Sequence, residues 1–193
     1  MTEQKTSPRI IALVGLSGVG KSKAVELVST MMTFEAVYFG GVVLAEVRAR
    51  GLDPTPDSEA AVREDLRREF GMAAMAHKSL PAILEALGTG RHVLIDGLYS
   101  YAEYKLLGDR FGDALAVIAV HARKTVRIAR LAARPVRPLT AAEMALRDAR
   151  EVDRLEKAPP IALADYHVVN DGSEADLRAA LEACVEAITM PAG

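Results

Sequence analysis

The residues best suited to chemistry lie near the start of the chain, in the stretch Gly15-Leu16-Ser17-Gly18-Val19-Gly20-Lys21-Ser22. This stretch fits the pattern G-x-x-x-x-G-K-[ST] of a phosphate-binding loop. Its glycines allow successive backbone N–H groups to point at phosphate oxygens. Lys21 is the residue type that reaches the β- and γ-phosphates, and the Ser22 hydroxyl is a ligand for Mg²⁺. The stretch therefore predicts a nucleoside triphosphate site made of Gly15, Ser17, Gly18, Val19, Gly20, Lys21 and Ser22.

A carboxylate at the end of a later strand pattern is the second candidate. Residues 91–96 read as a strand that ends at Asp96 and is followed by Gly97. Ligands of open parallel sheets bind at the carboxyl ends of the strands, so we expect Asp96 near the phosphate loop. There it could hold Mg²⁺ or accept a proton from an acceptor hydroxyl. The alternative is an acidic residue that only closes a strand. The neighbouring Gly97 argues against motor and transporter ATPases, which use a glutamate at that position.

Arginines recur at helical spacing before a proline-bounded loop. Spacings of four, three and four residues place on one helix face Arg123, Arg127, Arg130 and Arg134. Arg134 and Arg137 then enter the loop. Like charges at this spacing repel unless an anion lies between them, and loop arginines could neutralise a transferred phosphoryl group. The alternative is a solvated basic face paired with acids such as Glu143 or Glu151. The pattern favours a catalytic role for Arg134 and Arg137 and leaves Arg127 and Arg130 open.

The elements that must position these residues alternate between strand and helix patterns. Strand patterns lie at 10–14, 35–39, 91–96, 114–120 and 166–170, and the fourth is apolar throughout, as expected of a strand covered on both faces. Helical patterns lie at 21–32, 42–50, 59–87, 101–111, 124–133, 140–157 and 173–188. This alternation predicts an α/β fold with a parallel sheet.

Glycine, proline and helix-capping residues mark the expected boundaries of these elements. We expect Gly40-Gly41 to end the second strand and Ser58 or Asp57 to cap the helix that follows. Within residues 59–87, Gly71 and Pro81 are the expected break or kink points. Thr140 and Glu143 form a capping box, and Pro159-Pro160 should end the helix that begins there.

Composition narrows the class of protein. With 193 residues, half of them apolar, the chain is long enough for one domain with a substantial core. Its net charge of −2 does not indicate general binding to nucleic acid. The single Cys184 excludes an internal disulfide and a cysteine-based zinc site. No apolar run approaches the length of a membrane span, and a polar N-terminus precedes a strand rather than a signal-peptide core, so we expect a cytoplasmic protein.

Together these motifs resemble a family of small phosphate-loop kinases that includes dephospho-coenzyme A kinases and adenylate-kinase-like proteins. The resemblance is strongest to an uncharacterised, largely archaeal branch and covers nearly the whole chain. It rests on residues 15–22, Tyr38-Phe39-Gly40, Leu94-Ile95-Asp96-Gly97-Leu98 and Arg147-Asp148. It also rests on the more specific patterns R-x-x-R-L-x-x-R in residues 127–134 and A-D-Y…N-x-G-S in residues 164–173.

The resemblance implies a P-loop nucleoside-triphosphate-binding fold with a five-stranded parallel sheet in the order 2-3-1-4-5. It implies one kinase domain over residues 1–193, with an acceptor-binding helical region at about 40–88 and an arginine lid at about 130–140. The nucleotide base would lie near Asn170 to Gly172. Nucleotide contacts beyond the loop would come from Arg130, Arg134, Asn170 and Gly172. Acceptor contacts would come from Gly40, Gly41, Tyr99 and Arg147.

Three positions depart from the pattern of that branch. It usually carries Asp where this chain has Gly41, Arg near Leu44 and Arg where this chain has Tyr99. In related kinases such an acid activates the acceptor, and such arginines bind an acceptor phosphate. The donor half is therefore intact and the acceptor half altered, which leaves Asp96 as the best candidate base.

The sequence thus predicts an ATP-dependent, Mg²⁺-requiring kinase with a small-molecule acceptor, similar to dephospho-coenzyme A or nucleoside monophosphate kinases. Lys21, Asp96, Arg134 and Arg137 would be catalytic, with Ser22 and Asp96 placing Mg²⁺. The alternative is a nucleotide-binding NTPase or regulatory module whose acceptor site has decayed. A GTPase is disfavoured because no N-K-x-D motif occurs. We expect neither a nucleic-acid nor a membrane partner, and the oligomeric state stays open.

Overall fold

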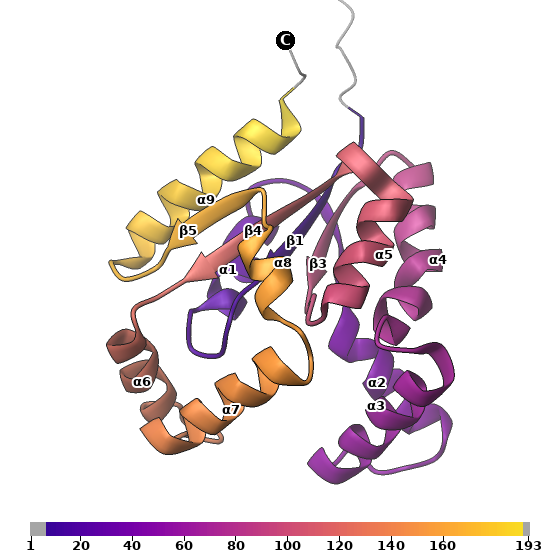
Figure 1. The fold of residues 1–193 in the computed structure, drawn as a ribbon. Coiled ribbons are helices and arrows are strands. Elements are labelled where there is room, and N and C mark those ends of the chain that lie inside the picture. The colour runs from indigo at the N-terminus through magenta and orange to yellow at the C-terminus, as the bar shows by residue number, and fades with distance from the viewer. Residues whose placement is uncertain (1–6, 191–193) are drawn as a thin grey trace, which may run out of the picture.

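A sheet of five parallel strands forms the centre of the molecule (Figure 1). The computed structural model describes residues 7–190. The strands are β1 (Ile10–Val14), β2 (Phe34–Tyr38), β3 (His92–Asp96), β4 (Leu115–His121) and β5 (Tyr166–Val169). Their order is β2-β3-β1-β4-β5, and every neighbouring pair is parallel. The predicted α/β fold and the strand order 2-3-1-4-5 are confirmed.

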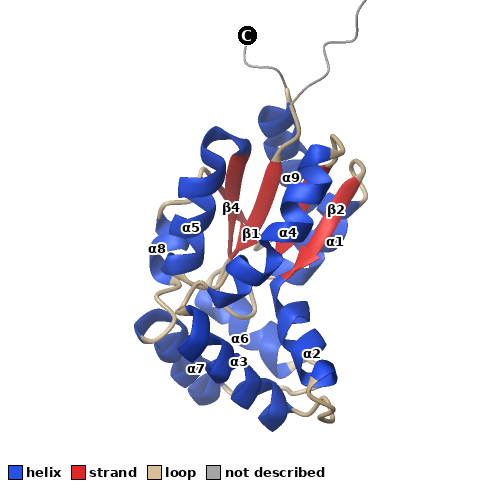
Figure 2. Cartoon of the chain, turned by 90° about the vertical axis from the view of Figure 1, so that its right-hand side faces the viewer, coloured by secondary structure: helices blue, strands red, loops and turns tan. Residues whose placement is uncertain are grey.

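Helices cover both faces of this sheet and extend beyond its carboxyl edge. They are α1 (Lys21–Ser29), α2 (Phe39–Ala49), α3 (Pro56–Phe70), α4 (Ala74–Gly88), α5 (Tyr101–Phe111), α6 (Lys124–Ala132), α7 (Ala141–Asp153), α8 (Ala158–Ala162) and α9 (Glu174–Thr189), with a short 3₁₀ turn η1 (Gly112–Ala114) before β4. Helices α4 and α5 cover one face, and α1 and α9 cover the other (Figures 1 and 2). Past the strand ends, α2 and α3 lie on one side and α6 and α7 on the other (Figure 1). The functional site is expected in that space.

Strand β1 holds the two layers together because all five of its residues are buried. Side chains of a strand alternate between faces. Ile10 and Ala12 accordingly pack in the core under α4 and α5, while Ile11 and Leu13 pack with α1 and α9. Each fully buried isoleucine or leucine contributes about 1.5–3 kcal/mol. The carboxyl end of β1, where the phosphate-binding loop begins, is therefore anchored from both sides.

The prediction that Gly40-Gly41 ends the second strand is wrong, because β2 ends at Tyr38, one residue before the predicted end at residue 39. Helix α2 begins at Phe39, directly after β2, and both glycines lie in its first turn. Packing, rather than turning, explains the glycine at position 40. A Cβ atom there would lie 2.3 Å from the Tyr38 ring, which folds back over the helix start.

Other boundaries differ in ways that local chemistry explains. Thr55, not Ser58 or Asp57, caps α3, and Ser58 completes the capping box from inside the helix. The break at Gly71 is confirmed, whereas Pro81 lies within α4 and does not end it.

The helix that begins after Thr140 has the predicted capping box with Glu143 but is shorter than predicted. It ends at Asp153 instead of Lys157. Pro159-Pro160 starts α8 instead of ending the earlier helix, because proline is tolerated in a first turn, where the N–H has no partner.

No helix within residues 7–190 is both long enough and apolar enough to cross a bilayer.

A buried carboxyl group stands at the start of α5. Ser100 caps this helix, and Glu103 Oε2 accepts hydrogen bonds from the backbone N–H groups of Tyr99 (2.8 Å) and Ser100 (3.0 Å). Burial raises the pKa of Glu103 to about 7, although these bonds and the charge of Arg67 act in the opposite direction. The folded chain therefore holds a proton on Glu103 at pH values where the unfolded chain has lost it.

This proton should make stability fall as pH rises from about 4.5 to about 7. In Glu103→Gln that part of the pH dependence should vanish, so wild type should lose about 2 kcal/mol more than the variant between pH 5 and pH 8. Urea unfolding at several pH values measures the difference. Glu69→Gln, at an exposed position of α3, serves as the control and should follow wild type. Identical slopes for wild type and Glu103→Gln would contradict the assignment.

Candidate active site

The phosphate-binding loop connects β1 to α1 and is pressed between neighbouring segments. At Gly15, with φ +154°, a Cβ atom would lie 2.6 Å from the carbonyl oxygen of Val120 in β4. At Gly20, with φ +91°, it would lie 2.3 Å from Nδ2 of Asn170, just after β5. Only glycine fits at either position, because backbone and side-chain atoms approach too closely for any Cβ.

Side chains from outside the loop bind its carbonyl groups. Arg127 Nε donates to the carbonyl oxygen of Ser17 (2.7 Å), and Asn170 Nδ2 donates to that of Val19 (2.8 Å). Arg130 Nη1 donates to the carbonyl of Asn170 (2.9 Å) and, at 3.4 Å, to that of Val19. The Val19 N–H donates to the carbonyl oxygen of Leu16 (3.4 Å), and the other N–H groups of the loop are left for an anion.

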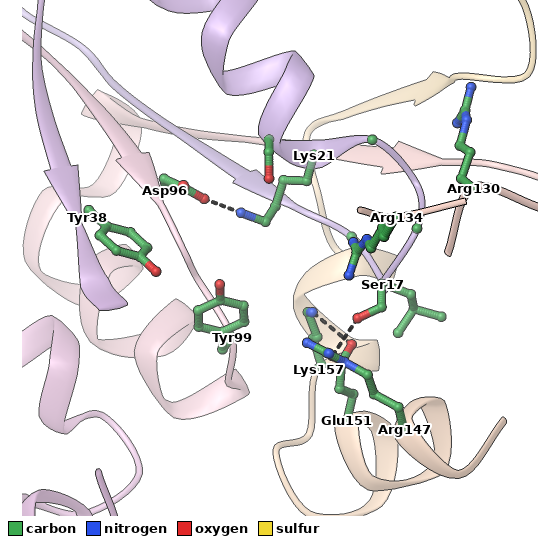
Figure 3. Close-up of a pocket in the computed structure, with 15 residues that line it drawn as sticks. Ser17, Lys21, Tyr38, Asp96, Tyr99, Arg130, Arg134, Arg147, Glu151 and Lys157 are labelled. Atoms are coloured by element: carbon green, nitrogen blue, oxygen red, sulfur yellow. Dashed lines mark hydrogen bonds and ion pairs between the residues drawn. The ribbon is translucent and has the colours of Figure 1, made fainter. Parts of the chain in front are cut away.

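The loop lines a cleft of about 420 Å³ at the carboxyl edge of the sheet. Register places Asp96 of β3 between Leu13 of β1 and Tyr38 of β2. Lys21 forms an ion pair with the Asp96 carboxylate, and both side chains are mostly buried. Figure 3 shows the two pointing at each other, with Tyr38 and Tyr99 on the same side of the cleft. The prediction that Asp96 lies near the phosphate-binding loop is therefore confirmed, because its carboxylate pairs with Lys21 of that loop.

A buried carboxylate, Glu151 of α7, connects the loop to α7 and to Lys157 beyond that helix. It accepts hydrogen bonds from Ser17 Oγ (3.0 Å), Arg147 Nε (3.0 Å) and Lys157 Nζ (2.9 Å) (Figure 3). Burial pushes the pKa of Glu151 upward, but Lys157 and Arg147 outweigh this effect and lower it. Burial lowers the pKa of Lys157, whose side chain is only 3% exposed and whose Nζ lies 4.9 Å from the centre of the Tyr99 ring.

Two residues of this site, Glu151 and Lys157, were not predicted from the sequence. The spacing of Arg147 and Glu151, four residues apart on a helix, was a signal for their pairing. Nothing in the sequence around Lys157 indicates that its side chain is buried, since the residue follows a charged helix and precedes two prolines.

A second cleft, of about 280 Å³, adjoins the first. Four residues line both clefts: Tyr38, Tyr99, Arg147 and Glu151. The remaining lining of the second cleft comes from Phe39, Gly40, Val43, Arg63, Arg67, Met75 and Leu155. Burial raises the pKa of Tyr99, so its hydroxyl stays protonated at neutral pH.

Most of the predicted site residues meet in these clefts. The first cleft is lined by Gly15, Ser17, Gly18, Gly20, Lys21, Ser22, Asp96, Tyr99, Arg130, Arg134 and Arg147. Val19 is buried and contributes its carbonyl to the contacts beneath the loop, where Asn170 also lies. Gly40 lines the second cleft only.

Besides Val19 and Asn170, three further predicted residues lie outside both clefts. Arg137 is exposed on the segment between α6 and α7, Gly41 packs beside the Tyr38 ring, and Gly172 lies against Asp176 at the start of α9.

The arginine-rich face of α6 divides between structural and cleft-lining roles. Arg127 is buried and pairs with Asp148 of α7 (2.5 Å), and Arg123 pairs with Asp171 (2.9 Å). Their partners are thus neither Glu143 nor Glu151, because the packing of α6 against α7 presents Asp148 instead. Arg130 and Arg134 line the first cleft.

Oxygen ligands for a divalent cation are present in the first cleft. Within residues 7–190, no three His, Cys, Asp or Glu side chains gather as a metal site. The Ser22 hydroxyl and the Asp96 carboxylate both line the cleft, and Mg²⁺ prefers such oxygen ligands. Nucleotide-dependent Mg²⁺ sites take further ligands from phosphates and water, so the residues present fit this ion.

Comparisons with known proteins place this geometry in a family. Residues 11–149 match a family model described as an AAA domain. A UPF0200 protein from Aeropyrum pernix is 38% identical over 169 residues, which cover 87% of each chain. The chain belongs to the UPF0200 family. The resemblance to a largely archaeal branch of small phosphate-loop kinases is thereby confirmed.

Solved structures agree with the fold of this UPF0200 chain. TT1252 from Thermus thermophilus has a TM-score of 0.65 at 20% identity, covering 95% of this chain and 99% of that one. A dephospho-CoA kinase from Campylobacter jejuni has a TM-score of 0.53 at 14% identity, with coverages of 95% and 98%. At such identities the likeness shows the fold alone, which is a P-loop kinase-like nucleotide-binding fold.

The buried pair at Lys157 generates a stability prediction. Lys157→Met should lower the free energy of unfolding by about 3 kcal/mol, because it removes one partner of a buried ion pair and leaves Glu151 undercompensated. Urea denaturation measures this loss. The matched control is Lys124→Met at the exposed start of α6, which should stay within about 0.5 kcal/mol of wild type. Equal effects of the two substitutions would show that the pair at Lys157 contributes nothing.

Proposed function

We propose that this UPF0200 protein is an ATP-dependent kinase that transfers the γ-phosphoryl group to a small-molecule acceptor. The observation that carries the proposal is the second cleft, which shares Tyr38, Tyr99, Arg147 and Glu151 with the cleft of the phosphate-binding loop. A transferase needs a space for an acceptor beside its triphosphate. A protein that only binds or hydrolyses nucleotide needs no such second cleft.

The donor side of the mechanism begins with the Lys21–Asp96 ion pair. An incoming triphosphate carries more negative charge than one carboxylate, so it competes with Asp96 for Lys21. The loop N–H groups and Lys21 then bind the phosphates, and Arg130 and Arg134 add positive charge from the lid side. Asp96 is released at the moment when an acceptor needs it.

The freed Asp96 carboxylate serves the acceptor. It accepts the proton of the acceptor hydroxyl while that oxygen attacks the γ-phosphorus. The bond from the γ-phosphorus to the β–γ bridging oxygen breaks, and ADP leaves. Ser22 and Asp96 would hold Mg²⁺, which would neutralise phosphate charge when bound. Positioning and electrostatic stabilisation supply most of the rate in such reactions.

The decisive experiment is a transfer assay that identifies the class of acceptor. Purified protein is incubated with ATP labelled at the γ-phosphate and a panel of nucleosides, nucleoside monophosphates and dephospho-coenzyme A. Label transferred to one of these acceptors supports the kinase. Tight nucleotide binding with only slow phosphate release across the whole panel would instead favour a regulatory module, which the residues at Gly41, Leu44 and Tyr99 suggested.

The donor site predicts the effect of Lys21→Ala. This variant should lose turnover by at least about 100-fold, because the cation at the β- and γ-phosphates is gone. Lys23→Ala is a matched control, since Lys23 lies on the same helix and is exposed, where it pairs with Glu26. Steady-state kinetics compares both with wild type. Full activity of a folded Lys21→Ala variant would refute the mechanism.

The two loop arginines should differ. Arg134 lines the first cleft and Arg137 does not, so Arg134→Gln should lower kcat by about 10-fold or more and Arg137→Gln by much less. The measurement is kcat at saturating ATP for both variants. An equal or larger loss in Arg137→Gln would mean that the lid carries Arg137 to the transferred group, as the sequence analysis expected.

A further inference from the structure

We propose that the acceptor is a polyanion whose phosphate groups, remote from the accepting group, bind between α3 and α7. This inference rests on the proposed kinase function and names the substrate class of its acceptor side. The observation behind it is a cluster of arginines that line the second and third clefts, described below.

A third cleft, of about 630 Å³, continues the series away from the phosphate-binding loop. It shares Arg67, Arg147, Glu151 and Leu155 with the second cleft, and Arg147 and Glu151 also line the first. The three clefts therefore adjoin one another, and the phosphate-binding loop lines only the first. The second and third clefts together are lined by six arginines, Arg63, Arg67, Arg68, Arg147, Arg150 and Arg154, against the two acids Glu64 and Glu151.

The arginines come from two facing helices. On α3, Arg63 and Arg67 are four residues apart and share a face. On α7 and its C-cap residue Arg154, spacings of three and four residues align Arg147, Arg150 and Arg154. Both helices line the third cleft, and they stand on opposite sides of the opening below the sheet (Figure 1). Like charges on the two walls repel across the cleft unless an anion lies between them.

The acids nearby leave most of this charge uncompensated. Arg68 pairs with Asp65 (3.0 Å), and Arg147 shares Glu151 with Lys157. Within residues 7–190, no ion pair involves Arg63, Arg67, Arg150 or Arg154.

Arg67 stands at the junction of the second and third clefts and lacks a partner for a buried atom. Its Nε is shielded from solvent and donates to no acceptor in the described part of the chain. Burial lowers the pKa of Arg67, and the charge of Glu103 opposes this only in part. A buried donor without an acceptor is costly, so a ligand oxygen at this position would be strongly favoured.

The number and arrangement of the guanidinium groups favour phosphate over carboxylate. One arginine fork satisfies a carboxylate with two parallel hydrogen bonds. Four unpaired arginines on two walls suit groups with three acceptor oxygens and nearly two charges each. The continuity of the clefts then places such groups on the same molecule as the accepting hydroxyl.

Binding of inorganic phosphate tests the arginine site directly. The phosphate-binding loop is first saturated with a non-hydrolysable ATP analogue and Mg²⁺, and phosphate is then titrated by isothermal calorimetry. Wild type should bind it, and Arg67→Gln and Arg154→Gln should each weaken binding by about 10-fold. Arg154 is exposed, so its variant separates loss of binding from misfolding. Arg48→Gln, at an exposed position of α2 outside these clefts, should bind as wild type does.

Two outcomes of this titration would overturn the inference. One is the lack of a specific phosphate site once the loop is filled. Phosphate would then either not bind at all, or bind equally to all the variants, which would mean an adventitious ion only. The other is equal or tighter binding of succinate, which would make the arginine cluster a carboxylate site.

An acceptor series separates this inference from the kinase proposal. Each nucleoside is compared with its monophosphate and bisphosphate, and kcat/KM should rise by about 100-fold with each added phosphate that α3 and α7 hold. Arg67→Gln should reduce this gain, measured within the same variant as the ratio of kcat/KM for the phosphorylated acceptor to kcat/KM for the unphosphorylated nucleoside. Efficient transfer without any preference for phosphorylated acceptors would overturn the inference and leave the kinase standing. No transfer to any acceptor would overturn the kinase proposal, and the acceptor proposal with it.

Discussion

The hydrogen bonds that Arg127, Arg130 and Asn170 make to the phosphate-binding loop are the constraint on which the site depends. A loop can present its N–H groups to phosphates only if its carbonyl groups are satisfied elsewhere. Here the partners come from α6 and from the end of β5, so the loop is shaped by elements more than a hundred residues away along the chain. Arg127 is itself fixed by Asp148, which makes α7 a part of the same support.

This arrangement connects the phosphate-binding loop to α7 and Lys157 through single side chains. Glu151 binds Ser17 of the loop, Arg147 of its own helix and Lys157 beyond that helix. Any movement of α7 must therefore either carry these partners along or break hydrogen bonds to a buried carboxylate, which is costly. Because α7 also lines the arginine cleft, a ligand held there acts on a helix that contacts the phosphate-binding loop. The phosphate-binding loop and the third cleft are thus connected through α7.

The sequence was sufficient for those features that depend on local patterns. The loop, the strand patterns and the capping box at Thr140 each depend on a few neighbouring residues in the sequence. The strand order was predicted from the family resemblance instead. Long-range contacts were beyond reach. Arg127 could have been a ligand for polyphosphate or a structural residue, and only the packing of α6 against α7 decides for Asp148. Gly40 was expected to end the second strand, and nothing local in the sequence shows that the Tyr38 ring lies against it. The burial of Lys157 could not be predicted, since it depends on contacts with both Glu151 and Tyr99.

The acceptor side shows most clearly why position in the sequence is a weak guide to charge in space. The absence of arginine at Leu44 and Tyr99 suggested a weakened site for an acceptor phosphate. Tyr99 nevertheless lines the same cleft as Arg63 and Arg67, which come from α3. A phosphate responds to the charge and hydrogen-bond donors around it, not to the helix that supplies them. Arginines can therefore move between elements that border one cleft, and a comparison made position by position records a loss where the cleft itself remains strongly basic.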